Sequence, residues 1–206
     1  GPTYEAIDPV RYLGNKSSGK QGIEIAKAFQ NLGANVSLVL GPSKENVPSN
    51  INTINIQSAK DMFEEIKKIK NIDIAVCAAA VSDWTIDNPS KNKIKKNDTV
   101  KPKINLSLNP DILHYISNNK NNRPKLVIGF AAETEDLIKN AQEKLNKKNC
   151  DWILANDVSK NPEIFGGDNN SISLITKNNI EEWNTVTKKE VAEKLASKVI
   201  ESIEKK

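Results

Sequence analysis

Three short apolar runs, each placed after a segment of helical periodicity, constrain the fold of this chain more than any other feature. They occupy residues 72–80, 126–131 and 152–155. Near-continuous apolar runs of this length are typical of parallel strands that are buried on both faces. Strands that alternate with helices imply right-handed crossovers. The sequence therefore predicts an α/β fold of the Rossmann-like type, with a doubly wound, mostly parallel sheet and helices on both faces.

The remaining pattern supplies the other elements of this fold. Helices are expected over residues 19–32, 58–70, 109–116 and 133–148 and from 187 to the end, and shorter strands over 35–40, 53–56, 104–108 and 171–176. Ser58 with Asp61, and Thr187 with Glu190, are capping-box pairs that mark two of the helix starts. Loops are expected over residues 8–18, over the long Lys-rich stretch 83–103 and around 166–168.

We expect one domain over residues 1–206, because the chain has no internal repeat and no linker that would divide it. The opening Gly1-Pro2-Thr3 has the composition of a turn that follows a strand. A first strand is therefore expected to precede Gly1. Two explanations stay open: the chain is cut from a longer polypeptide, or its true start is not shown.

The composition excludes several classes of protein. The net charge of +4 is spread along a chain with only 5% aromatic residues, whereas a nucleic-acid binder would show a basic stripe with interleaved aromatics. No apolar run reaches membrane-spanning length, and no signal peptide is expected. Cys77 and Cys150 lack the spacing of a zinc site or a disulfide framework. We therefore expect a cytoplasmic protein that binds neither nucleic acid nor membrane.

The stretch from Gly14 to Gly22 resembles a phosphate-binding loop without matching one fully. Gly14, Gly19 and Lys20 fit the P-loop spacing, but Gln21 stands where a Ser or Thr should ligate Mg²⁺, and no buried strand leads into the loop. The Walker interpretation is therefore rejected. Two alternatives stay open, a helix start whose free N–H groups face a phosphate, or an ordinary helix capped by Ser17 or Ser18.

In doubly wound sheets, ligands bind beyond the carboxyl ends of the strands. The polar residues that follow the three buried runs are Asp83, then Glu133 and Thr134, then Asn156 and Asp157. Together with residues 15–19 they are expected to converge on one crevice.

Charged residues near this crevice have both functional and ordinary interpretations. A loop that carries Lys93, Lys95 and Lys96 could close over a triphosphate, although a solvated charge run is the commoner explanation. His114 is interpreted as structural or exposed, and Cys77 as an inert buried thiol. No nucleophile–base pair is evident. The chemistry expected is therefore positioning and charge neutralisation, as in phosphoryl or nucleotidyl transfer with Mg²⁺.

A set of short motifs, in this order along the chain, closely resembles the phosphopantothenate–cysteine ligase family, also called phosphopantothenoylcysteine synthetase. The motifs are Asp8-Pro9-Val10-Arg11-Tyr12, Asn15-x-Ser17-Ser18-Gly19-Lys20-x-Gly22, Ala78-Ala79-Ala80-Val81-Ser82-Asp83-Trp84, Lys93-Ile94-Lys95-Lys96, Asn109-Pro110-Asp111-Ile112-Leu113, Gly129-Phe130-Ala131-Ala132-Glu133-Thr134 and Ala155-Asn156-Asp157-Val158-Ser159. The likeness extends from Gly1 to about Leu174 and points to the bacterial, CTP-dependent type.

The resemblance implies a reaction. Enzymes of this family join 4′-phosphopantothenate to L-cysteine in coenzyme A biosynthesis. In the bacterial type, CTP with Mg²⁺ activates the pantothenate carboxylate as an acyl-cytidylate and releases pyrophosphate. The cysteine amine then attacks and CMP leaves. The family is dimeric, with the site near the interface, and bacterial forms are often fused behind a flavin-dependent phosphopantothenoylcysteine decarboxylase.

The resemblance also implies roles for individual residues. Asn15 and Lys93 match the catalytic positions, Asn15 in turnover of the acyl-nucleotide and Lys93 in its formation. Pantothenate-side contacts fall on Asn15, Ala79, Ala80 and Asp83. Nucleotide or phosphate contacts fall on Ser17, Gly19, Gly22, Asp83, Pro110, Asp111, Ile112, Leu113, Phe130, Lys144, Lys148 and Asn156. The metal ligands are not identified.

A Rossmann-type nucleotide- or dinucleotide-binding module without ligase activity is the alternative. The sequence lacks Gly-x-Gly-x-x-Gly and lacks an acidic residue that closes a second strand, which speaks against a dinucleotide site. Calorimetric titration with CTP and with NADP(H) would distinguish the two.

Overall fold

The structure, a computed structural model, describes residues 1–96, 102–158 and 169–204. The loop expected around 166–168 and the last residue of the 155–159 motif lie outside the described residues. Five strands form the main sheet in the order β11-β10-β9-β8-β5. β5 (Ile74–Cys77), β8 (Leu126–Glu133) and β9 (Trp152–Asp157) are parallel, while β10 (Asn169–Thr176) and β11 (Ile180–Thr187) run antiparallel to their neighbours. The α/β class is confirmed, but the sheet is mixed.

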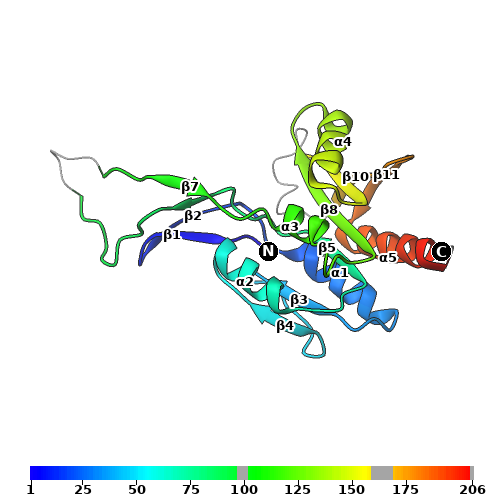
Figure 1. Cartoon of the computed structure of the whole chain (residues 1–206), viewed down its shortest axis with the longest axis horizontal. Coiled ribbons are helices and arrows are strands. Elements are labelled where there is room, and N and C mark those ends of the chain that lie inside the picture. The colour runs from blue at the N-terminus through cyan, green and yellow to red at the C-terminus, as the bar shows by residue number, and fades with distance from the viewer. Residues whose placement is uncertain (97–101, 159–168, 205–206) are drawn as a thin grey trace.

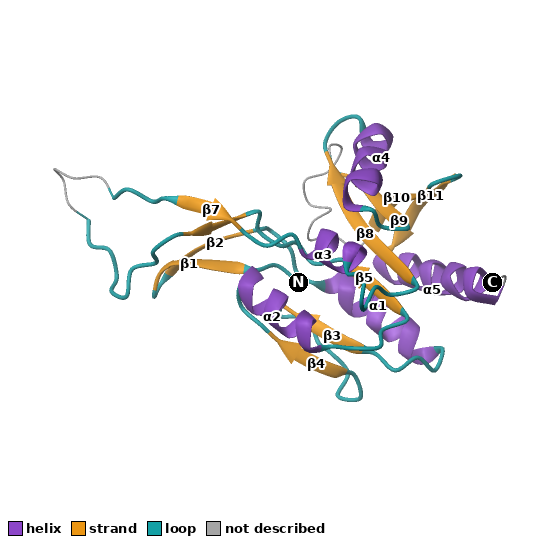
Figure 2. Ribbon diagram, viewed as in Figure 1, coloured by secondary structure: helices purple, strands orange, loops and turns teal. Residues whose placement is uncertain are grey.

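Helices cover both faces of the main sheet (Figures 1 and 2). α1 (Lys20–Asn31) and α5 (Lys188–Glu204) share one apolar cluster with β8, β9 and β10. α2 (Ala59–Lys68), α3 (Ile112–Asn118) and α4 (Leu137–Lys148) share the other. Strand residues alternate between the two clusters, with Ile128 and Leu154 in the first and Val127 and Ile153 in the second, as the twofold period of a strand requires.

The predicted helix signals are largely confirmed. Ser58 and Asp61 form the expected capping box at α2, and Thr187 and Glu190 exchange the same pair of hydrogen bonds before α5. The expected helix over 133–148 begins later, at Leu137. β8 continues to Glu133, and Asp136, with a φ of 46°, turns the chain into the helix.

A groove of about 1120 Å³ separates β5 from the parallel pair β3 (Ser37–Leu40) and β4 (Asn52–Asn55). Apolar side chains of α1, α2, β3 and β5 line it, including Ile25, Met62, Val39 and Val76. The run over 72–80 was expected to be buried on both faces. Instead β5 is an edge strand and all four of its residues are only half-buried, because this groove lies beside it.

The first residues of the chain lie at the end of this groove. Pro2 forms a parallel bridge with Ala80, and the Ala80 amide donates to the Gly1 carbonyl at 3.1 Å. On the other side, Gly41 comes directly after β3, and its backbone lies against that of Pro2. A Cβ atom added at Gly41 would lie 1.8 Å from the Pro2 carbonyl oxygen. The backbone at Gly1 and Pro2 is therefore held between the ends of β3 and β5.

Gly41→Ala should destabilise the protein by about 3 kcal/mol, since its clash is with backbone that cannot move aside cheaply. Gly22→Ala is the matched control, because a Cβ atom there meets nothing within 4 Å. In the interior of α1 that alanine should stabilise by about 1 kcal/mol. Urea denaturation of both variants checks the prediction, and equal stability of the two would contradict it.

Four short strands form an arm that projects from the body (Figure 1). β1 (Tyr4–Asp8) pairs with β2 (Arg11–Gly14), and β6 (Trp84–Ile86) pairs with β7 (Leu106–Leu108), both antiparallel. We refer to the described residues 4–14, 84–96 and 102–108 as the arm. The expected strand over 104–108 is present as β7. The loops expected over 8–18 and 83–103 are wrong at β2 and β6, because the backbone of β2 forms hydrogen bonds with β1 and that of β6 with β7.

The buried carboxylate of Glu5 attaches the arm to the body. It accepts hydrogen bonds from the Ala59 amide at the start of α2 (3.0 Å) and from the Thr85 hydroxyl in β6 (2.9 Å). Polar partners of this kind are what allow a carboxylate to be buried. The root of the arm is therefore fixed to α2.

Candidate active site

The groove continues beyond the carboxyl ends of β5 and β8, and we refer to this part of it as the crevice. Ten of the residues predicted to bind substrate or nucleotide line the groove and its crevice: Gly22, Ala79, Asp83, Pro110, Asp111, Ile112, Leu113, Phe130, Lys144 and Lys148. They come from the first turn of α1, the loop after β5, the start of α3, β8 and one side of α4. This is the edge at which an α/β sheet of this type binds its ligands.

The start of α3 is built around Asp111. Its Oδ1 accepts from the His114 amide at 2.9 Å, which caps the helix, and its Oδ2 forms an ion pair with the Lys148 ammonium. Burial alone would raise the pKa of Asp111, but the hydrogen bonds from Lys148 and His114 hold that pKa below its ordinary value. The pair joins α3 to α4 at the crevice wall.

Lys144 is the second cation of this wall, one helical turn before Lys148. Its Nζ donates to the Phe130 carbonyl at 2.8 Å. Burial lowers the pKa of Lys144, while the nearby carboxylates of Glu133 and Asp83 act in the opposite direction. Two ammonium groups in one wall suit an anionic ligand such as a nucleotide phosphate.

Asn15 lies at the same end of the fold as Asp83. Its Nδ2 donates to the carbonyls of Ala80 (3.0 Å) and Val81 (3.1 Å), in the loop that leads to Asp83. An amide nitrogen carries two hydrogens, so both are engaged with backbone. Asn15 thus fixes the shape of the loop after β5 and is itself oriented by that loop.

The serine and glycine residues before α1 have structural partners. The hydroxyls of Ser17 and Ser18 accept from the Gly19 and Lys20 amides (3.4 and 3.2 Å), but the N-cap of α1 is Gly19, which provides no side-chain cap hydrogen bond. Gly19 has a φ of 83°. A Cβ atom added at Gly19 would lie 3.1 Å from the Cα atom of Gly1. The expectation that Ser17 or Ser18 is the N-cap is therefore wrong, because Gly19 takes that position in the left-handed conformation.

Lys93 is not brought to the crevice within one chain. The next residue, Ile94, donates its amide to Asp8 (3.1 Å) and accepts at its carbonyl from Arg11 (2.9 Å), both at the β1–β2 turn. Asn15 follows the opposite end of β2, and a four-residue strand spans about 10 Å. Asn156 is likewise outside the groove lining, in β9 between Ala132 of β8 and Ile172 of β10.

Sequence reasoning missed Asn109 and the Asp8–Arg11 pair. Asn109 ties the start of α3 to the loop after β5, through its Nδ2 to the Ser82 carbonyl and its amide to the Asp83 carbonyl, both at 2.9 Å. An Asn before Pro-Asp is a turn signal that could have indicated this. Asp8 is buried beside the Arg11 guanidinium, and no sequence pattern links that pair to Ile94.

The Arg11 guanidinium holds the pKa of Asp8 well below its ordinary value, with the Val10 and Ile94 amides adding to the effect and burial opposing it. The ionised form therefore stabilises the folded state above about pH 4 and loses this contribution as the pH falls further. Asp8→Asn should lower the melting temperature at pH 7 by more than at pH 3. A difference that stays constant between these pH values would contradict the prediction.

No group of three or more His, Cys, Asp or Glu side chains lies together among the described residues. The side chain of Asp83 is exposed and lines the groove. In addition, no described helix has the length and apolar character needed to cross a bilayer.

The open α/β sheet, with a cationic crevice beyond the carboxyl ends of its strands, places the protein in the Rossmann-like class of α/β proteins. Within that class, a family model described as "DNA/pantothenate metabolism flavoprotein C-terminal domain" matches residues 1–203, and the chain belongs to this family.

One relative is "Coenzyme A biosynthesis bifunctional protein CoaBC" of Haemophilus influenzae, 42% identical over 208 residues, which cover 100% of this chain and 51% of the relative. The chain spans about half the length of the curated relatives it matches.

Solved structures show the same likeness. The C-terminal domain of a coenzyme A biosynthesis bifunctional protein CoaBC superposes with a TM-score of 0.81 at 35% identity, covering 100% of this chain and 93% of the other. A Cab2 mutant in complex with phosphopantothenate-cysteine superposes with a TM-score of 0.73 at 15% identity, over 100% of this chain and 84% of that one. The second likeness shows the fold alone.

Proposed function

We propose that this chain is a phosphopantothenate–cysteine ligase, which joins 4′-phosphopantothenate to L-cysteine at the expense of CTP in coenzyme A biosynthesis. The observation that carries the proposal is the crevice, where the loop after β5, the start of α3 and the two α4 lysines meet. The names of the relatives and their 42% identity support it.

In the first step, a pantothenate carboxylate oxygen attacks the α-phosphorus of CTP, and the bond to the β-phosphate oxygen breaks. The products are an acyl-cytidylate and pyrophosphate. Lys144 and Lys148 oppose the negative charge of the phosphates, and the Asp111 carboxylate orients Lys148. A bound Mg²⁺ would neutralise further phosphate charge.

In the second step, the cysteine amine attacks the acyl carbon, the bond to the cytidylate breaks, and the amine loses a proton as CMP leaves. Asn15 is the proposed contact for the acyl group, next to the carbonyls of Ala80 and Val81. A crevice that excludes water protects the activated acyl group from hydrolysis.

We propose a homodimer formed through the arm, in which a second copy supplies Lys93 to the crevice. Seven exposed large apolar side chains lie on the arm: Val10, Tyr12, Leu13, Trp84, Ile104, Leu106 and Leu108. Exposed apolar patches of this kind mark interaction surfaces. The distance of Lys93 from the crevice of its own chain supports an arrangement in which the site is completed across the interface.

We also propose that a further strand, N-terminal to Gly1, occupies the groove between β3 and β5. Pro2 already continues the parallel pairing with Ala80, and both neighbouring strands expose unpaired backbone edges. Such a strand would complete the single domain.

A flavin-dependent phosphopantothenoylcysteine decarboxylase is the proposed partner, fused or separate, because relatives named as bifunctional proteins extend well beyond this chain. Such an enzyme would consume the product. We place the reaction in the cytoplasm, where the two free thiols of Cys77 and Cys150 would stay reduced.

Pyrophosphate release from CTP tests the proposal. We expect release only when 4′-phosphopantothenate and Mg²⁺ are both present, and continuous turnover only when L-cysteine is added. ATP and GTP serve as comparison nucleotides, and calorimetric titration with NADP(H) tests the dinucleotide alternative. No pyrophosphate release from folded dimer, or tight binding of NADP(H) with none of CTP, would contradict the proposal.

A further inference from the structure

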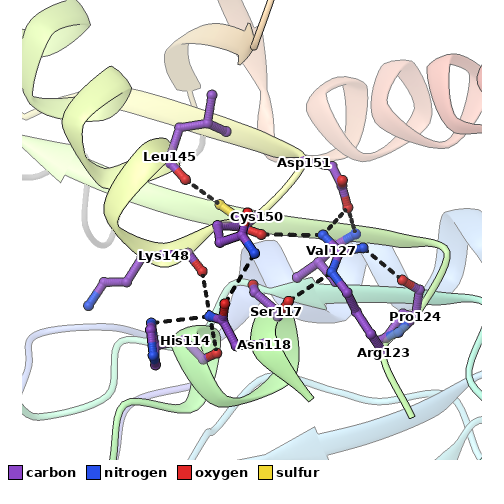
Figure 3. Close-up of polar contacts among 11 residues, drawn as sticks. His114, Ser117, Asn118, Arg123, Pro124, Val127, Leu145, Lys148, Cys150 and Asp151 are labelled. Carbon is purple, nitrogen blue, oxygen red and sulfur yellow. Dashed lines mark hydrogen bonds and ion pairs between the residues drawn. The ribbon is translucent and has the colours of Figure 1, made fainter. Parts of the chain in front are cut away.

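A polar network joins the end of α3 to the end of α4 (Figure 3). The inference drawn from it rests on the proposed function, because it concerns how the α4 lysine of the crevice is held. The network contains His114, Ser117, Asn118, Arg123, Lys148, Asn149 and Asp151.

Lys148 is tied to both ends of α3. Its ammonium pairs with Asp111, the N-cap of the helix, and its backbone carbonyl accepts from Nδ2 of Asn118, the last helical residue, at 3.2 Å. Figure 3 shows the carbonyl directed at Asn118 while the side chain extends the other way. Asp111 therefore sets the position of the ammonium, and Asn118 sets the position of the backbone that carries it.

The Asn118 amide is fully oriented by its neighbours. Nδ2 also donates to the His114 carbonyl at 2.8 Å and lies 3.2 Å from Nδ1 of His114, and Oδ1 accepts from Nδ2 of Asn149 at 3.1 Å. Asn149 ends α4 in the left-handed conformation, with a φ of 58°, which Asn tolerates better than other side chains. The last turn of α4 is thus fastened to α3 on both sides of its cap.

Arg123 connects the same place to the central sheet. Its Nε donates to the Ser117 carbonyl (2.8 Å), and its Nη2 donates to the Asn149 carbonyl (3.3 Å) and to Oδ2 of Asp151 (3.0 Å). Asp151 in turn accepts from the Val127 amide of β8 at 2.7 Å. Arg123 and Asp151 therefore link the contact between α3 and α4 to β8, the strand that also carries Phe130.

We infer that Asn118 is a positioning residue for nucleotide binding. By holding the last turn of α4 against α3, it keeps Lys148 and the Pro110–Leu113 turn facing one bound ligand. Without it, Lys148 would sample arrangements that do not bind, and the apparent affinity would fall by the fraction of molecules that remain competent. Asn118 lies in the network and outside the groove lining, so it touches no nucleotide itself.

Asn118→Ala should weaken CTP binding about tenfold, as expected when one hydrogen bond holds the competent arrangement. We expect the KM for CTP to rise by the same factor, with kcat within about twofold and the KM for 4′-phosphopantothenate unchanged. Asn118→Asp, which keeps the acceptor for Asn149 but cannot donate to Lys148, should show the same loss. Asn121→Ala, on the exposed turn after α3, is the control and should match the wild type.

Calorimetry with CTP separates this inference from the proposed function. A wild type that binds CTP but releases no pyrophosphate would contradict the ligase assignment and leave the binding comparison intact. Equal CTP affinity in Asn118→Ala, Asn118→Asp and wild type would overturn the inference. Amide hydrogen exchange in the last turn of α4 needs no ligand; it should be faster in both Asn118 variants than in Asn121→Ala, and equal rates would also overturn the inference.

Discussion

Lys93→Gln should reduce acyl-cytidylate formation by at least about a hundredfold, as expected when a charge that stabilises the transition state is removed from a phosphoryl-transfer site. The variant should fold normally, because Lys93 is exposed. Pyrophosphate release in a single turnover without cysteine measures the effect. Lys91→Gln, on the same loop and also exposed, is the matched control and should retain full activity.

The same variant tests whether the site is shared between two copies. If Lys93 of one copy serves the crevice of the other, a mixed dimer of Lys93→Gln and Asn15→Asp contains one intact site. An equimolar mixture of the two inactive variants, after subunit exchange, should then recover about a quarter of wild-type activity, since about half of the dimers are mixed. No recovery would show that both residues act within one chain, and wild-type rates in Lys93→Gln alone would remove its catalytic role.

Asn15→Asp should let the acyl-cytidylate form but slow its use by cysteine about a hundredfold. A carboxylate at this position would lose both hydrogen bonds to Ala80 and Val81 and would repel their carbonyl oxygens. The proposed contact with the acyl group would therefore be lost, while the two α4 lysines that face the phosphates stay in place. Rapid-quench measurement of the intermediate distinguishes the two steps.

Asn50→Asp, in the exposed turn before β4, makes the same chemical change away from the crevice and should be without effect. Simultaneous loss of both half-reactions in Asn15→Asp, with an unchanged melting temperature, would contradict the assignment to the second step.

Several features of the fold could be predicted because they depend on local sequence. The Ser58–Asp61 capping box is a property of four residues, and the apolar run over 126–131 is buried on both faces as expected. β11 could not be predicted in the same way. Its residues alternate polar and apolar only weakly, and it becomes a strand because it pairs with β10 and buries Trp183.

Some features of the candidate site could likewise be predicted from the sequence, and others could not. The residues at the start of α3 lie in a short motif, whereas Lys144 and Lys148 of α4 were assigned through the family resemblance alone. The strand order brings both groups to one wall. The separation of Lys93 from that wall was not recognisable, because it depends on Asp8 and Arg11 binding Ile94 from a distant part of the chain. Roles for individual residues stay predictions until the variants are measured.

The sequence by itself determined the α/β class, the capped helices and the family to which the chain belongs, because these follow from patterns within a few consecutive residues. Only the tertiary structure decided which side chains share the crevice, that the Lys93 loop lies along the arm, and that Asn118 fastens α4 to α3. Contacts of this kind join residues far apart in the chain, and their geometry is set by packing of whole elements, which no local pattern encodes.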